Sequence, residues 1–284
     1  MNKKFLVSGG DGQLACSFKN IQENYKWADF VFLNKTELDI SLKENIQNVV
    51  KYYKPDYFIN CAAYTSVDKA ESEKDKTYLI NHIAVKNIAE VCSKNNISLI
   101  HYSTDFVFQG NSIKPYQEND ITNPLNIYGK SKLAGEISIN NQANLNYIIL
   151  RTSWVYAEHG NNFVKTMLRL FDSKDEIGVV DDQYGAPTYA LDIAECTLKL
   201  IEMDFINRNT LHFSNGGNIS WYDFACEIKK IISNDIKITP ITTKEYPTPA
   251  IRPKYSVMNL SKIKSLGINI DDWKLSLKDC LNKL

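Results

Sequence analysis

The chain has 284 residues, enough to bury roughly three quarters of its unfolded surface in one large domain or in a main domain with a smaller companion. Lysine plus arginine and aspartate plus glutamate number 33 each, and no basic block stands out, so nucleic acid and anionic membranes are disfavoured as partners. The six cysteines lack the spacing of metal ligands, no signal-peptide pattern opens the chain, and no apolar run approaches the ~20 residues of a membrane span. We therefore expect a cytoplasmic protein with reduced thiols.

A short apolar strand is expected at residues 3–7, and glycines and then a helix-forming segment follow it directly. At this junction Gly9, Gly12 and Ala15 have the spacing G-x-x-G-x-x-A. The glycines permit a tight turn and let a pyrophosphate approach the N terminus of the helix, while the third position packs the helix on the sheet. The segment therefore predicts a dinucleotide-binding site, although glycines also form ordinary turns.

Strands and helices alternate through the first part of the chain. Strands are expected at residues 29–33 and 56–63, an amphipathic helix at 41–54, and one long helix at 67–96. This alternation predicts an α/β protein with a doubly wound parallel sheet, in which ligands bind beyond the carboxyl ends of the strands. The small residues at 60–64 form such an end, where they leave room for a flat ring or a ribose, or else pack under the next helix.

A phenol and an amine follow the next strand. That strand breaks at the polar residues 103–105, Ser-Thr-Asp, and Tyr128 and Lys132 then stand four residues apart in a helix-forming segment. A cation beside the phenol would lower the pKa of Tyr128 toward the range in which it exchanges a proton with a carbonyl or alkoxide. Thr104 can orient the same carbonyl. A solvated helix face gives the same spacing, so the glycine motif is what favours catalysis.

The later part of the chain has a different texture. After a strand at 146–156, with Trp154 where a substrate would lie, and a helix at 163–171, loops rich in turn formers predominate. We expect a dinucleotide-binding domain at residues 1–170 and a smaller substrate-binding portion, interleaved with the sheet, at 171–284. The proline-rich loop at 246–256 holds Arg252, Lys254 and Tyr255, which suit a phosphate or a plain surface connection equally well.

Two histidines, His82 and His101, have no partner at ligand spacing, and we interpret both as structural.

Together these motifs resemble the extended short-chain dehydrogenase/reductases. The likeness rests on the glycine segment at 9–14, Asn-Cys-Ala-Ala at 60–63, Ser-Thr-Asp at 103–105 and Tyr-Gly-Lys-Ser-Lys at 128–132. Further segments, such as STDFVFQG, RTSWVYA, DQYGAPT and YPTPAIRPKYS, are similar over nearly the whole chain to the members of this family that reduce 4-keto nucleotide sugars.

The resemblance implies a Rossmann-like fold, NADP(H) as cofactor with NAD(H) also accepted, and hydride transfer from the nicotinamide to C4 of a keto sugar. It implies that Tyr128 gives the proton, that Lys132 tunes Tyr128 and binds the nicotinamide ribose, and that Thr104 holds the carbonyl. A homodimer is compatible with it. The implied cofactor contacts are Gly9, Gly12, Gln13, Leu14, Asp39, Ile40, Ala62, Ala63, Tyr64, Tyr128 and Lys132. The implied contacts of the nucleotide sugar are Thr65, Val67, Thr104, Asp105, Tyr128, Trp154 and Arg252.

Three residues depart from the family pattern. Ala15 replaces the third glycine, and Phe106 stands where many relatives have tyrosine. Some relatives bind magnesium through acidic residues, one of them in the first helix where this chain has Ser17, so we expect no metal site.

Two other functions stay open at this point. A nucleotide-sugar epimerase or dehydratase would use the same Tyr128 and Lys132 but would keep NAD bound. The Ser-Thr-Asp triplet and the short chain favour a reductase instead. A non-catalytic, reductase-like regulatory subunit would share the fold, but it would have no need of Thr104, Tyr128 and Lys132 together.

The choice of nicotinamide depends on the end of the second strand. NAD-specific folds place there an acid that binds the ribose 2′-hydroxyl and repels a 2′-phosphate. This chain has Asn34 and Lys35 at that point, so we expect NADPH to be accepted at least as well as NADH. Glu37 is the residue that would overturn this expectation, if its carboxylate turned back to the ribose.

Overall fold

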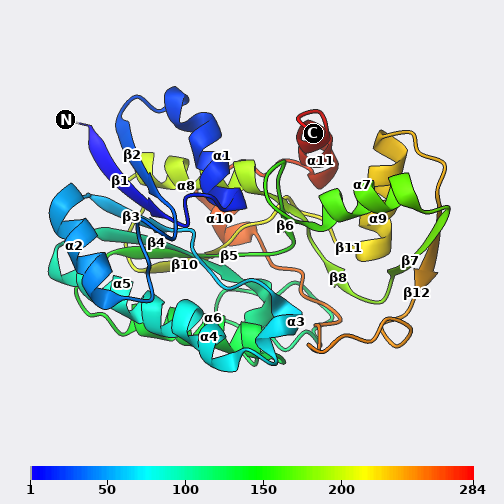
Figure 1. Ribbon diagram of the computed structural model, residues 1–284, viewed down its shortest axis with the longest axis horizontal. Helices are drawn as coiled ribbons and strands as arrows, with labels where there is room; N and C mark the ends of the chain where they lie inside the picture. Colours follow the sequence, from blue (N-terminus) through cyan, green and yellow to red (C-terminus); the bar gives the residue numbers. More distant parts are fainter. Residues whose placement is uncertain (1) are drawn as a thin grey trace.

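One central parallel sheet organises the molecule, and the computed structural model describes residues 2–284 (Figure 1). The sheet has six strands in the order β10-β5-β4-β3-β1-β2, and all neighbours pair in parallel. The chain path reverses between β1 and β3, which opens a crevice at the carboxyl edge between them. The predicted doubly wound α/β class is therefore confirmed. The strands are β1 (Lys3–Ser8), β2 (Ala28–Leu33), β3 (Tyr57–Asn60), β4 (Ser98–Thr104), β5 (Tyr147–Thr152) and β10 (Asn209–His212).

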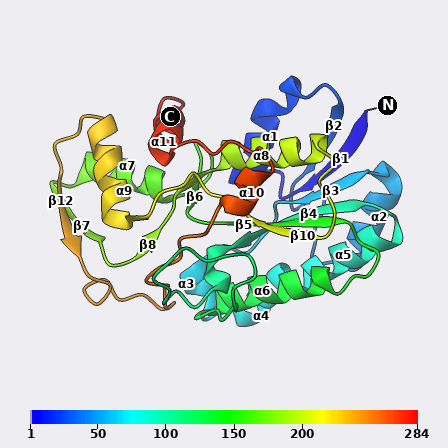
Figure 2. The ribbon, with the colours of Figure 1, turned by 180° about the vertical axis from the view of Figure 1, so that it is seen from behind.

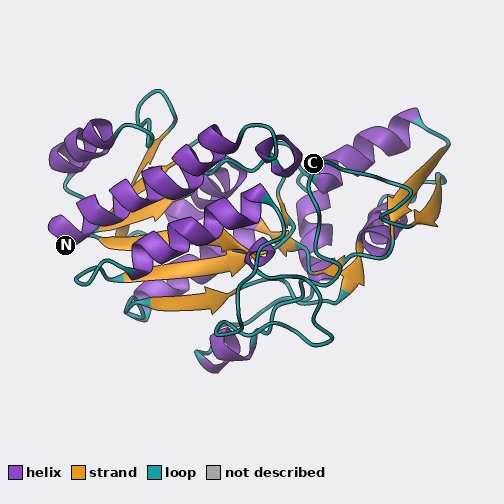
Figure 3. Ribbon diagram, turned by 90° about the horizontal axis from the view of Figure 1, so that it is seen from below, coloured by secondary structure: helices purple, strands orange, loops and turns teal. Residues whose placement is uncertain are grey.

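Helices cover both faces of this sheet, which is why its strands are apolar nearly throughout (Figure 2, Figure 3). On the face of α1 and α8, Phe5 and Val7 of β1 join Phe18 in one apolar cluster. On the face of α2, α5 and α6, Leu6 packs into a second cluster, as the two-residue period of a strand requires. Within residues 2–284 no helix is both long and apolar enough to cross a membrane. The helices are α1 (Gln13–Ile21), α2 (Lys43–Tyr53), α5 (Val85–Lys94), α6 (Ile127–Asn140), α8 (Ala190–Glu202) and the short α10 (Ser261–Ser265).

The single long helix predicted at residues 67–96 is wrong in its first half. The chain forms α3 (Val67–Ala70), breaks, and continues as α4 (Lys74–Tyr78), the π-helical turn η2 (Leu79–Ala84) and α5. The wider turn places Asn81 inside the molecule, where its side-chain oxygen accepts from the Tyr64 N–H at 2.9 Å and its amide donates to the Tyr64 carbonyl at 3.0 Å. The buried Asn81 amide is thus fully hydrogen-bonded, and it holds the loop after β3 in place.

A smaller unit stands beside the sheet and has its own apolar core around Tyr156, Phe224 and Leu277 (Figure 1). The strand expected at 146–156 ends at Thr152, and a separate β6 belongs to this unit. The chain leaves the unit to form α8 and β10 on the main sheet and then returns. The domain boundary expected at residue 170 falls inside α7 and stays a prediction. The unit contains β6 (Val155–Tyr156), α7 (Phe163–Ser173), β7 (Glu176–Val180), β8 (Tyr184–Gly185), β9 (Thr188–Tyr189), β11 (Ile219–Ser220), α9 (Trp221–Ile231), β12 (Lys237–Ile241) and α11 (Trp273–Leu281).

A buried ion pair holds α6 to the sheet. Arg151, at the end of β5, donates from Nη2 to Glu136 of α6 at 2.7 Å and from Nε to the same carboxylate at 3.0 Å. Arg151 also donates to the carbonyl of Glu118 at 3.1 Å and lies over the ring of Phe108. The two charged side chains are only 7% and 2% exposed. The pair therefore fixes the helix that carries Tyr128 and Lys132.

We predict that Arg151→Met lowers the free energy of unfolding by about 3–5 kcal/mol, because it leaves the Glu136 carboxylate buried and unpaired. Urea unfolding followed by circular dichroism measures the loss. The double variant Arg151→Met with Glu136→Leu removes both charges and should recover most of it. Equal stability of the wild type and the single variant would contradict the role given to this pair.

Candidate active site

The turn after β1 prepares the N terminus of α1 for an anion. Gly9 has a φ of 69°, and a Cβ there would lie 2.9 Å from backbone atoms of Ala62, so glycine is required. The Gly12 N–H donates to the Gly9 carbonyl at 2.8 Å, and α1 begins at Gln13. No side chain caps the first turn of α1, so its N–H groups are free to bind a phosphate. This turn fits the pyrophosphate of a dinucleotide, as the sequence predicted.

The end of β2 has its own hydrogen-bonded turn. The Glu37 carboxylate accepts from the Asn34 N–H at 2.9 Å, and the Asn34 side-chain oxygen accepts from the Thr36 hydroxyl at 2.7 Å. Farther on, Asp39 accepts from the Ser41 hydroxyl at 2.6 Å, and this bond keeps the pKa of Asp39 below its usual value. Lys35 is exposed. Glu37 has therefore turned back, but toward the backbone of its own turn.

A cavity of about 270 Å³ opens at the carboxyl ends of β4 and β5. Six residues predicted as site residues line it, and they come from α1, the loop after β3, the end of β4, α6 and the loop after β5. The position of Thr152 at the end of a buried strand was an available signal, but it was not predicted as a site residue. The further lining residues that were not predicted are five: Ser103, Thr152, Ser153, Val155 and Asn161. The predicted residues that meet here are Gln13, Thr65, Thr104, Asp105, Tyr128 and Trp154.

Tyr128 lies beside Thr104 and Asp105 in this cavity. Burial raises the pKa of Tyr128 to about 12, the hydrogen bond with Thr104 lowers it, and the Asp105 carboxylate raises it. Burial also raises the pKa of Asp105 to about 6, against hydrogen bonds that include one from the Thr104 hydroxyl at 3.0 Å. The phenol is therefore protonated at neutral pH.

The net lowering of the Tyr128 pKa that we expected does not occur in this structure, because burial raises that pKa. The Lys132 amine turns toward the sheet, where it donates to the Tyr102 carbonyl at 2.6 Å and lies 3.5 Å from His101 Nε2. Burial lowers the pKa of Lys132 itself to about 8, while the Glu136 carboxylate raises it. Burial thus dominates at both groups: the phenol keeps its proton, and the amine releases one slightly above neutral pH.

Close packing fixes Tyr128 relative to Thr104. A Cβ at Gly129 would lie 2.3 Å from the Phe106 carbonyl oxygen, so only glycine lets α6 approach the end of β4 this closely. Asn126 caps the helix by accepting from the Gly129 N–H at 2.8 Å. These contacts hold the first turn of α6, which carries Tyr128, against the end of β4, which carries Thr104.

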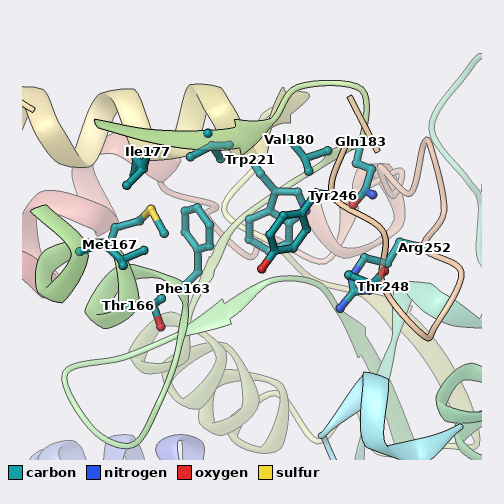
Figure 4. A pocket seen from close by; sticks show the side chains of 13 residues that line it. Phe163, Thr166, Met167, Ile177, Val180, Gln183, Trp221, Tyr246, Thr248 and Arg252 are labelled. Carbon is teal, nitrogen blue, oxygen red and sulfur yellow. The ribbon is translucent and has the colours of Figure 1, made fainter. Parts of the chain in front are cut away.

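Aromatic side chains continue the site into the smaller unit. Trp154 has a φ of 47° and stacks on Trp221 at a centroid distance of 3.5 Å. Beyond Trp221 lies a second cavity of about 460 Å³. Figure 4 shows Phe163, Met167 and Ile177 at its apolar end. The opposite, polar end is lined by Gln183, Thr248 and Arg252 (Figure 4).

Arg252 is already paired. Its guanidinium forks onto Asp68, from Nη2 at 2.7 Å and from Nη1 at 3.0 Å, and this contact holds the pKa of Asp68 low. The loop that carries Arg252 is thereby tied to α3, whose first residue is Val67. Arg252 also lines a small gap together with Trp154 and Trp221, so it lies between the two cavities. Sequence reasoning placed Arg252 at the site but missed Asp68.

Residues 3–284 match the model of a protein family described as "RmlD substrate binding domain". A curated relative from Aggregatibacter actinomycetemcomitans, named dTDP-4-dehydrorhamnose reductase, is 40% identical over 97% of both chains. The chain belongs to the dTDP-4-dehydrorhamnose reductase family.

Solved structures of the family agree with this assignment. A dTDP-4-dehydrorhamnose reductase from Clostridium acetobutylicum superposes with a TM-score of 0.94 at 40% identity over 99% of both chains. One from Bacillus anthracis, in complex with NADP, gives a TM-score of 0.94 at 38% identity over 100% of both chains. In the part of this chain that the structure describes, no group of three or more His, Cys, Asp or Glu side chains is placed to hold a metal ion.

Proposed function

We propose that this chain reduces the C4 keto group of dTDP-4-dehydro-L-rhamnose to give dTDP-L-rhamnose, with NADPH or NADH as reductant. The observation that carries the proposal is the meeting of Thr104, Tyr128 and Trp154 around one cavity at the carboxyl edge of the sheet. The uncapped N terminus of α1 contributes Gln13 to the same cavity. Family membership supports the choice of sugar. The cytoplasmic location and the homodimer stay predictions.

The residues supply the proton side of the reaction. A reduced nicotinamide bound at the glycine turn and the N terminus of α1 would supply the hydride for C4. The Thr104 hydroxyl holds the carbonyl oxygen, and Tyr128 donates its proton to that oxygen, so that ketone, hydride and proton together give the alcohol. The phenolate left on Tyr128 is stabilised by the positive charge of Lys132, one helical turn away.

The two cavities suit the two ends of a nucleotide sugar. The sugar ring would lie against Trp154, and the apolar cavity beyond Trp221 has the aromatic walls that suit a planar base. Arg252, at the polar end of that cavity, would bind the diphosphate. In this structure the Asp68 carboxylate takes the position of that anion beside the guanidinium.

Incubation with dTDP-4-dehydro-L-rhamnose and NADPH tests the proposal. We expect one NADPH oxidised per sugar and dTDP-L-rhamnose as the product identified by NMR. An epimerase of the same superfamily would change a sugar without net oxidation of NADPH. A regulatory subunit would leave both compounds unchanged, and either result would refute the reductase.

We predict that Tyr128→Phe lowers turnover by about 10²–10⁴-fold, because it removes the proton donor and keeps the ring. The dissociation constant of NADPH, measured by fluorescence, should change little. Near-normal turnover would remove Tyr128 from the reaction.

For the substrate side, we predict that Arg252→Ala raises KM for the nucleotide sugar by about 10-fold or more, the worth of one charge-assisted contact, and changes kcat by less than about threefold. A diphosphate far from the reacting carbon is held alike in the ground and transition states, so its loss affects KM. Lys244→Ala removes an exposed cation from the same loop and serves as the control. A fall in kcat at unchanged KM would contradict this role for Arg252.

We also predict that NADPH is used at least as well as NADH, with a preference of no more than about tenfold in kcat/KM, the limit for one exposed ionic contact. The Glu37 carboxylate is bonded to the Asn34 N–H, and Lys35 can attract a 2′-phosphate. Steady-state kinetics with both cofactors at two salt concentrations measure this. A strong preference for NADH would show that an acid reaches the 2′-hydroxyl.

A further inference from the structure

Three polar side chains form a ladder across the three central strands of the sheet. Ser8 of β1, Asn60 of β3 and His101 of β4 are direct neighbours in the strand register. Their exposed fractions are 0%, 2% and 1%. The three strands lie side by side at the centre of the sheet (Figure 1). The carboxyl-edge end of the sheet therefore contains a continuous polar row that ends beneath α6.

Hydrogen bonds join the rungs of this ladder and lead to Lys132. The Ser8 hydroxyl donates to the Asn60 side-chain oxygen at 2.7 Å, and the Asn60 amide nitrogen lies 3.1 Å from His101 Nδ1. On the other side of the ring, His101 Nε2 lies 3.5 Å from Lys132 Nζ. Buried polar groups cost free energy unless they are paired, and an apolar rung would avoid the cost. The free-energy cost of burying these polar groups beside the Lys132 amine indicates a role other than packing.

The charge of Lys132 decides which ring nitrogen carries hydrogen. An ammonium has three N–H donors and no acceptor, so Nε2 must accept from it and Nδ1 must carry the hydrogen. Nδ1 then donates to the side-chain oxygen of Asn60. This requires the Asn60 amide in the orientation opposite to the one given above, with its nitrogen donating to the Ser8 hydroxyl. The turned amide keeps both contacts, because a hydroxyl accepts as readily as it donates. The ladder can thus accommodate a ring whose Nε2 accepts from Lys132.

We propose that His101 is a positioning residue for Lys132: together with the Tyr102 carbonyl it fixes two of the three N–H groups of the amine and leaves the third for the reaction site. The inference rests on the proposed function only in taking Lys132 as the amine that serves Tyr128 and the nicotinamide ribose. His101 touches neither the substrate nor the reacting atoms, so it acts through Lys132.

Few other groups compete for the charge on this amine. On its own helix, Glu136 raises the pKa of Lys132 and is itself paired with Arg151 of β5. The side chain that η2 presents to α6 is the neutral Asn81, bonded to Ser131 at 3.1 Å. Burial and the nearby ammonium hold the pKa of His101 well below its usual value, so the ring is neutral and can accept.

Two amide variants separate the two sides of the ring. In His101→Asn the shorter amide takes the place of Nδ1, so the contact with Asn60 is kept and the contact with Lys132 is lost. In His101→Gln the longer amide takes the place of Nε2 and keeps Lys132. The readouts are kcat for the keto sugar and the pH dependence of NADPH binding, which needs no turnover.

We expect NADPH binding to the wild type to weaken above about pH 8, where Lys132 loses its proton. In His101→Asn this break moves about one pH unit lower, because the ammonium has lost an acceptor, and kcat falls about tenfold. In His101→Gln both stay close to wild type. Unchanged behaviour of His101→Asn, or equal losses in the two variants, would overturn the positioning role.

One measurement reads the ring of His101 directly, without a substitution at that position. In the wild type with ¹⁵N-labelled histidine, NMR at neutral pH should show the His101 ring neutral, with its hydrogen on Nδ1. The signal is assigned by replacing the other three histidines in turn. Hydrogen on Nε2 would refute the proposal. If NADPH binding behaves as expected but the keto sugar is not reduced, the proposed function fails and the role of His101 stands.

Discussion

The burial of one charged amine is the constraint on which the site depends. Lys132 is 3% exposed, and a buried ammonium is tolerated only where its hydrogens are accepted and its helix is held in place. The Tyr102 carbonyl meets the first need from β4. The Glu136–Arg151 pair meets the second by joining α6 to β5. The same burial shifts the pKa of Lys132 down to about 8 and that of Tyr128 up to about 12, so both groups hold their protons at neutral pH.

Close packing and hydrogen bonds connect α6 to the rest of the site. Gly129 lets α6 approach the end of β4, and Asn81 in the π-helical turn ties α6 to the loop after β3 through Ser131 and Tyr64. The cofactor side and the catalytic side of the crevice are therefore joined by hydrogen bonds as well as by the sheet. On the substrate side, Asp68 pairs with Arg252 and so ties the loop beside the second cavity to α3.

The sequence predicted what depends on local pattern. The glycine turn, the alternating strands and helices, and the spacing of Tyr128 and Lys132 all rest on short-range rules, and the fold class follows from them. The π-helical turn at Leu79–Ala84, inside the helix expected at 67–96, was missed, because it accompanies a long-range contact between Asn81 and Tyr64. The pKa of Tyr128 was misjudged for a similar reason: burial, which spacing does not reveal, is the largest cause of its shift.

His101 shows the same limit from the other side. A single histidine in an apolar strand suggested only packing, and its position next to Lys132 depends on the register of β1, β3 and β4.

The most direct test of the central claim is the pH dependence of kcat/KM for reduction of the keto sugar. The proton on Lys132 is needed to stabilise the phenolate, and it is lost as pH rises through about 8. We therefore predict that kcat/KM falls above that pH, about tenfold per pH unit, as expected for the loss of one proton. A profile that stays flat well above pH 8 would contradict a buried, charged Lys132 as the group that serves Tyr128.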